Sequence, residues 1–245
     1  LQRVSKHPKL MFKDVIGDWP THERFILTSC DDKYFDAYFP RFYKTYTEHW
    51  QLPIHVHVVD ASKQSLDKLE ALDLSYTHCK TNRESLRFQY SYETYCQAQR
   101  FILLGHNIGP QQSVTVADVD SYALRKPNKV QTEVLGSDMA FTRFNGRLMA
   151  TFCNFHHGRR DEARHAAEEM RQLITDTDTI GIDQLVIKKV FNDLPYNRLK
   201  HGEWIRHFDV KTEHDLREHN KCLIYHEKGT RGKGKGMKVT WEDIC

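Results

Sequence analysis

The sequence lacks the marks of a membrane-spanning, secreted or disulfide-stapled chain. No apolar run approaches the roughly 18 residues that a transmembrane helix needs. The first residues do not follow the basic, apolar, small-residue order of a signal peptide. We therefore expect a cytoplasmic protein, although a segment cut from a membrane anchor would have the same composition.

The cysteines are too sparse for a disulfide framework. None of the six lies in a C-x-x-C pair, so we expect reduced and mostly buried thiols in a chain of this size. They are Cys30, Cys79, Cys96, Cys153, Cys222 and Cys245.

Strong net charge is also absent. The chain has 36 lysines and arginines against 33 aspartates and glutamates, and a net charge of +3 is too mild to indicate a nucleic-acid-binding protein. Hydrophobic residues make up 39% of the 245 residues, which is enough for the core of one larger domain. We expect an N-terminal arm over 1–22 (loose or a short helix), a single domain over 23–231 with halves at about 23–122 and 123–231, and a flexible basic tail over 232–245.

Strand-like and helix-like patterns alternate along the chain. Short apolar or alternating runs predict strands over 25–30, 54–60, 114–117, 138–142 and 149–154. Helical spacing of apolar residues predicts helices over 34–50, 62–72, 85–105, 159–175 and 183–191. The aromatic stripe of the first helix is typical of core packing, and Pro40 is expected to kink it. The alternation predicts an α/β fold with a mostly parallel central sheet flanked by helices.

Two carboxylates, Asp118 and Asp120, follow the strand-like run that ends at Ala117. Residues two apart in a strand point to the same side, so both side chains are expected to converge. Converging carboxylates repel each other unless a cation or a proton intervenes, and a hard divalent metal prefers oxygen ligands. Ligand sites of open α/β sheets lie at the carboxyl ends of strands. The alternative is a solvated turn or a helix N-cap, the commoner use of such a pair.

Four segments in this order resemble the GT-A class of nucleotide-sugar-dependent glycosyltransferases, whose fold is the Rossmann-like fold of nucleotide-diphospho-sugar transferases. They are the opening strand and loop Phe25–Tyr34, the Asp-x-Asp strand Val114–Asp120, the Asp-Gln segment Thr179–Leu185 and the closing His-x-x-Gly segment Leu223–Arg231. The familiar Asn-Gly-Gly-type segment of some relatives is lacking.

The resemblance implies a Mn²⁺ or Mg²⁺ site. Asp118 and Asp120 would hold the metal, and His226 would add an imidazole, a ligand that suits Mn²⁺ better than Mg²⁺. Lys228 and Gly229 would lie beside the diphosphate, with Arg231 as a further candidate. The alternative for His226 is a partly buried histidine that follows a strand.

The resemblance also implies a site for the nucleotide-sugar donor, with UDP-sugars favoured. The loop with Cys30 and Asp32 would receive the nucleobase, and Asp60 would contact the ribose or base. The alternative for Asp60 is an N-cap of the following helix, and the two roles can coexist. Arg83 and Arg100 are candidate partners for phosphate or for Asp118, and Arg100 is favoured by its position on a helix. A solvated or structural ion pair is the alternative for Arg83.

The implied activity is transfer of the sugar to a hydroxyl acceptor. Asp183 would deprotonate the acceptor in an inverting reaction. In a retaining reaction it would orient the acceptor or stabilise the oxocarbenium-like charge, and its purely structural alternative is a helix N-terminal carboxylate.

Two other classes compete with this interpretation. A sugar-nucleotidyltransferase needs a glycine-rich, basic loop after the first strand, whereas the loop here is acidic and has no glycine. A non-catalytic module would keep the fold and bind a sugar nucleotide or a polyanion through the basic tail.

Overall fold

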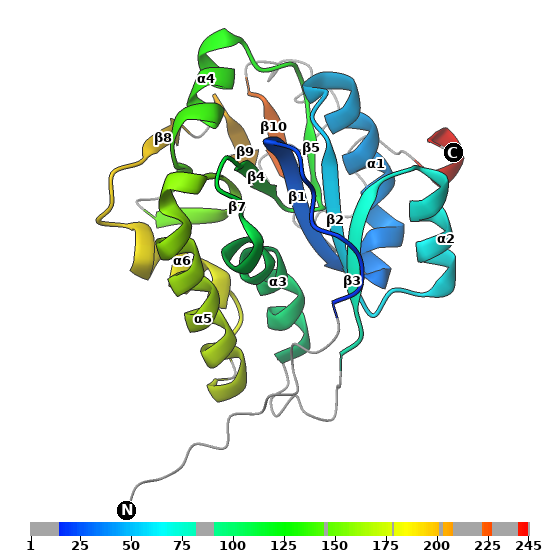
Figure 1. Ribbon diagram of the computed structural model, residues 1–245. Helices are drawn as coiled ribbons and strands as arrows, with labels where there is room; N and C mark the ends of the chain where they lie inside the picture. Colours follow the sequence, from blue (N-terminus) through cyan, green and yellow to red (C-terminus); the bar gives the residue numbers. More distant parts are fainter. Residues whose placement is uncertain are drawn as a thin grey trace, which may run out of the picture.

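The computed structural model describes residues 15–81, 91–144, 147–177, 179–200, 203–207, 222–226 and 240–244. A seven-stranded sheet with the order β3-β2-β1-β4-β7-β6-β8 forms the centre (Figure 1). Its strands are β1 Arg24–Asp31, β2 Ile54–Val59, β3 Ser75–Cys79, β4 Ser113–Ala117, β6 Ala140–Phe144, β7 Arg147–His156 and β8 Asn197–Lys200. Four of the six neighbouring pairs are parallel, and only the two pairs made by β7 are antiparallel. The predicted α/β fold with a mostly parallel sheet is confirmed.

Helices cover both faces of this sheet. One face packs against α3 Ser91–Asn107, α5 Arg160–Asp176 and α6 Ile182–Phe191, which together form one hydrophobic cluster with it. The other face packs against α1 Asp32–Trp50, α2 Lys63–Ala71 and α4 Lys129–Ser137. The strands β1, β2 and β4 are buried on both faces, so their polar residues, among them His55, His57 and Thr115, are buried as well.

The aromatic stripe of α1 is core packing, as the sequence predicts. Phe35, Phe39, Phe42 and Tyr46 are buried on the face that meets the sheet. Asp31 begins the helix by accepting a hydrogen bond from the backbone N–H of Tyr34 (2.8 Å). The 3₁₀ turn Trp241–Asp243, from the far end of the chain, packs its tryptophan against this helix, with ring centroids 5.0 Å from Phe35.

A second, three-stranded sheet has the order β5-β10-β9 and consists of β5 Ser121–Ala123, β9 Ile205–His207 and β10 Ile224–His226. β10 pairs antiparallel with β5 and parallel with β9. Since β5 follows β4 after one turn, this small sheet brings β10 to the carboxyl edge of the central sheet.

Residues 15–22 are neither loose nor helical. Ile16 pairs with the edge strand β3 through two backbone hydrogen bonds to His78 (2.8 and 2.9 Å). The Trp19 ring lies 5.4 Å from Phe25 and 5.3 Å from His55, and its indole N–H donates to Gln112 (3.0 Å). The expectation of a loose arm or a short helix is wrong for these residues, because Trp19 has an apolar site on the sheet.

Several short elements were not predicted. They are β3, β5, β8, β9 and α4. The helices predicted over 34–50, 62–72, 159–175 and 183–191 are confirmed within a few residues, and α3 confirms the described part of the helix predicted over 85–105. The five described cysteines are free and buried, as expected. No helix among the described residues is long and apolar enough to cross a membrane. The basic tail lies mostly outside the described residues.

A polar network crosses the buried face of β2 and β3. His55 bonds Ser75 (2.7 Å) and Thr77 (3.1 Å), and His57 bonds the same threonine (2.9 Å). Cys79 lies 3.4 Å from His57 Nε2 and 3.4 Å from the Tyr95 hydroxyl. We call these six residues the histidine network. Its imidazoles stay neutral, because burial lowers the pKa of His55 and of His57 to about 3.

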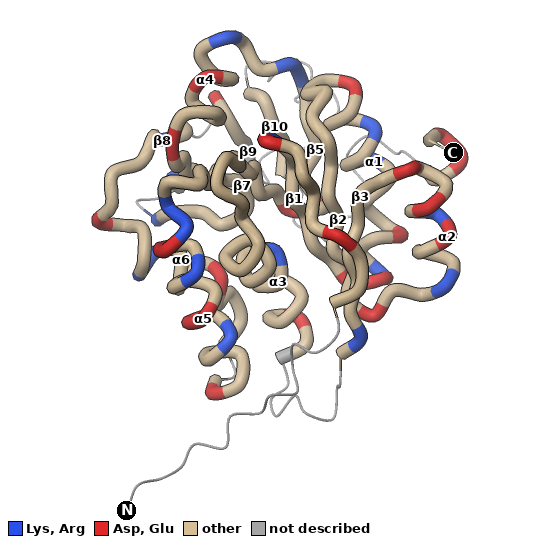
Figure 2. Tube along the Cα trace, in the orientation of Figure 1, with Lys and Arg blue, Asp and Glu red and all other residues tan. Residues whose placement is uncertain are grey.

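Charged side chains lie mainly on the outside of the molecule. Figure 2 shows acidic and basic positions interspersed along α2 and α5, not gathered by sign. This distribution agrees with the near-neutral balance of the sequence and gives no single-sign surface on these helices.

Candidate active site

The carboxyl ends of the parallel strands carry acidic residues. β1 ends at Asp31, β2 is followed by Asp60, and β4 is followed by Asp118. The chain moves from β1 to β2 on one side, whereas β4 lies on the other side of β1. The edge between β1 and β4 is therefore a topological switch point, where open α/β sheets bind ligands.

Asp118 and Asp120 converge because of a turn, not because of a strand. β4 ends at Ala117, and the backbone N–H of Ser121 donates to the carbonyl oxygen of Asp118 (3.0 Å). The N–H of Asp118 donates to the carbonyl of Thr151 on β7 (3.0 Å), which fixes the start of this turn. The predicted convergence is confirmed, but the predicted cause, alternation along a strand, is wrong.

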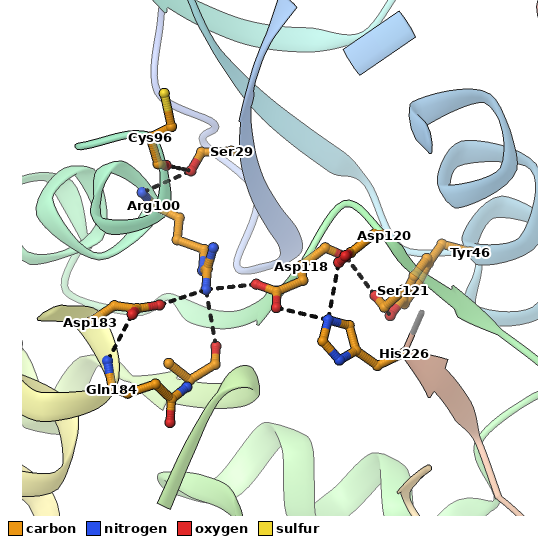
Figure 3. Close-up of polar contacts among 11 residues, drawn as sticks. Ser29, Tyr46, Cys96, Arg100, Asp118, Asp120, Ser121, Asp183, Gln184 and His226 are labelled. Atoms are coloured by element: carbon orange, nitrogen blue, oxygen red, sulfur yellow. Dashed lines mark hydrogen bonds and ion pairs between the residues drawn. The ribbon is translucent and has the colours of Figure 1, made fainter. Parts of the chain in front are cut away.

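His226 reaches both carboxylates from the other end of the chain. It stands opposite Ser121 in the register of β10 and β5. Its Nε2 lies 3.1 Å from Oδ2 of Asp118 and 3.0 Å from Oδ1 of Asp120 (Figure 3). Burial alone would lower the pKa of His226, but the two carboxylates outweigh it and raise the pKa to about 10.

The three side chains fit a divalent cation. Each offers one ligand atom, and these atoms lie within 4.8 Å of one another. Two carboxylate oxygens and one imidazole nitrogen are a donor set that suits Mn²⁺, and the oxygens also suit Mg²⁺. In this arrangement His226 provides the positive charge that offsets the two acidic groups.

Arg100 joins this cluster to Asp183. Its guanidinium lies 2.6 Å from Oδ1 of Asp118 and 3.1 Å from Oδ2 of Asp183, and Figure 3 shows it between the two carboxylates. Although burial would lower the pKa of Arg100, the two carboxylates raise it, so the group remains charged. The predicted pairing of Arg100 with Asp118 is confirmed.

Asp183 lies in the first turn of α6, as predicted. Gly181 precedes the helix with φ +78°, a conformation that favours glycine. Burial raises the pKa of Asp183, against the lowering effect of Arg100. Both carboxylate oxygens are engaged, since Oδ1 accepts from the backbone N–H of Gln184 (2.8 Å).

Gln184 has a structural partner that the sequence does not reveal. With its amide nitrogen oriented toward the carbonyl of Leu148 (2.9 Å), its amide oxygen accepts from the N–H of Ala150 (2.5 Å). The carbonyl of Ala150 also lies 3.5 Å from Arg100. The pairing of β6 with β7 shifts register next to these residues, so an irregular stretch of β7 contacts the backbone of Asp118 on one side and the side chain of Gln184 on the other.

The predicted nucleotide contacts on the β1 and β2 side occupy different environments. Cys30 is buried in the core beside α1, and burial raises the pKa of its thiol. Asp32 accepts from the backbone N–H of Ser62 (2.7 Å) and so fixes the loop before α2. Burial works against ionisation of Asp32, but hydrogen bonds from Ser62 and Ser65 prevail and lower its pKa.

Asp60 does not cap the following helix. Its backbone is left-handed (φ +55°), and its carboxylate accepts from the N–H of Thr81 (2.7 Å). The N-cap of α2 is Ser62, whose hydroxyl oxygen accepts from the N–H of Ser65 (3.1 Å). The capping role predicted for Asp60 is wrong, because the chain turns for two more residues before the helix begins.

The remaining predicted site residues lie outside the described residues. They are Arg83, Lys228, Gly229 and Arg231.

Known proteins resemble this chain in structure and not in sequence. No family model and no curated protein sequence matches the chain. Among solved structures, the galactosyltransferase LgtC in complex with donor and acceptor sugar analogues has a TM-score of 0.56 and 13% identity over 84% of this chain and 87% of LgtC. An active-site mutant of LgtC gives the same values. The bifunctional glycosyltransferase WbbM, in its apo form, has a TM-score of 0.60 and 12% identity over 96% of this chain and 51% of WbbM.

The chain therefore has the GT-A glycosyltransferase fold, and the resemblance noted from its sequence is confirmed at that level. A structural similarity at 12–13% sequence identity shows a shared fold and does not show a shared activity.

Proposed function

We propose that the protein is a metal-dependent glycosyltransferase that moves a sugar from a nucleoside-diphosphate sugar, with UDP-sugars favoured, to a hydroxyl acceptor. One observation carries the proposal: Asp118, Asp120 and His226 converge at the switch point of a GT-A fold. Fold alone would not support an activity, whereas a partly buried set of metal donors at the expected edge supports a specific chemistry.

Asp118, Asp120 and His226 would hold Mn²⁺ or Mg²⁺, whose Lewis acidity stabilises the charge that develops on a leaving diphosphate. Arg100 keeps its charge next to Asp118 and so favours the ionised carboxylate that a metal requires. The Arg100 pairing also fixes the orientation of Asp118, which leaves Oδ2 toward His226.

Asp183 is better placed to orient than to accept a proton. Arg100 and the N–H of Gln184 each donate to one of its oxygens, which fixes the carboxylate for an orienting role, and the Arg100 charge stabilises its ionised form against protonation. We propose that Asp183 positions the acceptor or stabilises positive charge at the sugar, the role that suits a retaining reaction.

The donor would lie along the edge from β2 to β4. We propose backbone contacts at Cys30, contacts of Asp32 and Asp60 with the nucleoside, and a contact of Arg83 with phosphate. Lys228, Gly229 and Arg231 follow His226 by only a few residues, which supports a place for them beside the diphosphate. The division into an arm, one catalytic domain and a basic tail, and the cytoplasmic location, stay predictions.

A thermal-shift screen of nucleoside diphosphates and their sugars, with Mn²⁺ and with chelator, tests the proposal. A ligand at 100 times its Kd adds about 2.7 kcal/mol to the free energy of unfolding, which raises the melting temperature measurably. We expect a shift with one nucleotide and only with metal, followed by transfer or hydrolysis of the matching sugar nucleotide.

Asp120→Ala should remove the metal-dependent shift, and His226→Ala should weaken it. Asp67→Ala on the exposed side of α2 is the matched control, which should bind as the wild type does. No shift with any nucleotide would contradict the proposal. Nucleotide binding that is independent of metal and weakens steeply as the salt concentration rises would instead favour the non-catalytic polyanion-binding module.

A further inference from the structure

The turn that carries Asp118 and Asp120 is held by a hydroxyl relay from α1. The Ser121 hydroxyl donates to the carbonyl oxygen of Asp118 (2.6 Å), and the Tyr46 hydroxyl lies 3.1 Å from the Ser121 hydroxyl (Figure 3). Tyr46 and Ser121 are both fully buried. The relay therefore connects the second half of α1 to the peptide that orients Asp118.

The direction of the relay follows from counting protons. Ser121 has one hydroxyl proton and gives it to Asp118, so Tyr46 must donate to Ser121. Burial raises the pKa of Tyr46, which keeps this donor protonated at neutral pH. The tyrosine ring is fixed by Phe42 and Trp50, whose ring centroids lie 4.4 and 5.5 Å away.

The neighbouring residue of the helix reinforces the same connection. The hydroxyl oxygen of Thr45 accepts from the backbone N–H of Ala123 (3.1 Å), two residues beyond Ser121. Since the N–H of Asp118 is held by Thr151, the turn is fixed from β7 at its start and from α1 at its end. The carboxylates of Asp118 and Asp120 project from the segment between these anchors.

We propose that Tyr46 is a positioning residue that sets the spacing of the Asp118 and Asp120 carboxylates through Ser121, and thereby the affinity of the site for a divalent cation. The inference rests on the proposed function in one respect, that these carboxylates hold a metal. Groups that orient metal ligands typically affect metal affinity by 10- to 100-fold. Tyr46 acts through one intervening hydroxyl, so we place its effect at the lower end of that range.

Tyr46→Phe tests the proposal because it removes one hydroxyl and keeps the ring. We expect the Kd for Mn²⁺, measured from the electron paramagnetic resonance signal of the free ion, to rise about 10-fold. Tyr43→Phe is the matched control, since Tyr43 lies on the same helix and its hydroxyl makes no hydrogen bond within the described part of the chain. Its Kd for Mn²⁺ should stay within twofold of the wild-type value, and its melting temperature should match that of the wild type.

Ser121→Ala provides the second variant, and it carries the test alone if Tyr46→Phe does not fold. It should weaken Mn²⁺ binding at least as much as Tyr46→Phe, and the double variant should be no weaker than Ser121→Ala, because both hydroxyls act in series. A Kd within twofold of the wild type in both variants, or two losses that simply add, would overturn the inference. The absence of Mn²⁺ binding by the wild type would instead count against the proposed function, so the two failures are distinguishable.

Discussion

Two buried regions of this protein hold histidines in different charge states, neutral in one and positively charged in the other. In the histidine network His55 and His57 face hydroxyls and a thiol, and burial lowers the pKa of each to about 3. At the candidate active site His226 is equally buried, but two carboxylates raise its pKa to about 10. Burial is therefore not what decides the charge of a histidine here; the charge of its partners is.

The same contrast extends to the whole of each region. The histidine network is satisfied by neutral hydrogen bonds, and no carboxylate is among its members. The candidate site consists of ions of both signs, in which Arg100 and His226 lie against three aspartates. A buried neutral group that loses one partner costs about 1–3 kcal/mol, whereas a buried ion that loses its partner costs about 3–5 kcal/mol.

Among single substitutions, the largest effect is expected when one ion of the site is removed. Arg100→Met should lower the free energy of unfolding by about 3–5 kcal/mol, because Asp118 and Asp183 lose their shared buried counter-charge. Urea unfolding followed by tryptophan fluorescence measures the loss. Lys189→Met, which breaks a more exposed ion pair with Glu169, should cost at most about 1 kcal/mol. Equal losses in the two variants would remove the distinction between buried and exposed pairs.

Lowering the pH should reduce the free energy of unfolding through the histidine network. The folded pKa of His55 and His57 lies below their unfolded value of about 6.5, so their contribution to stability is complete above that pH. It should fall as the pH drops from about 6.5 toward 3, by up to about 1.4 kcal/mol per pH unit for each histidine. The pH dependence of urea unfolding measures this slope.

Histidine NMR spectra give the direct reading of the same prediction. At pH 5 both rings of the network should remain neutral in the folded protein. An imidazolium signal from His55 or His57 at that pH would contradict the neutral network.

The smallest effect is expected from a single neutral partner. Thr77→Val removes the hydroxyl that both imidazoles share, and it should cost about 1–3 kcal/mol. Thr28→Val is the matched control, since Thr28 is a buried strand threonine whose hydroxyl has no hydrogen-bond partner among the described residues. That variant should be neutral or more stable, and a loss as large as that of Thr77→Val would point to packing instead of the network.

Much of the fold could be predicted because long elements carry periodic patterns. The helix α5 and the strands β1, β2 and β4 bury whole faces, so hydrophobic spacing reveals them. The strands β5 and β9 have three residues each and offer no period, and β3 is half polar. One missed helix did leave a signal: Asn128 and Gln131 form a capping box at the start of α4.

The candidate site was predicted by residue type but not by geometry. The Asp-x-Asp pair and its placement after a strand are local features, and the sequence displays them. Arg100 has one partner in the turn after β4 and another, Asp183, on α6. Asp183 is 83 residues from Arg100 in the sequence, and only the packed fold brings the two side chains together. The hydroxyl relay through Tyr46 spans 75 residues to Ser121 and leaves no pattern in the sequence.

The position of β10 sets an order of events during synthesis. His226 follows Asp120 by 106 residues, and it reaches the carboxylates only by pairing β10 with β5. Chains emerge from the ribosome with the N-terminal part first, so the central sheet has its strands before β10 exists. The three-donor set is therefore completed only after the central sheet, and tight metal binding would mark a chain in which β10 has joined the fold.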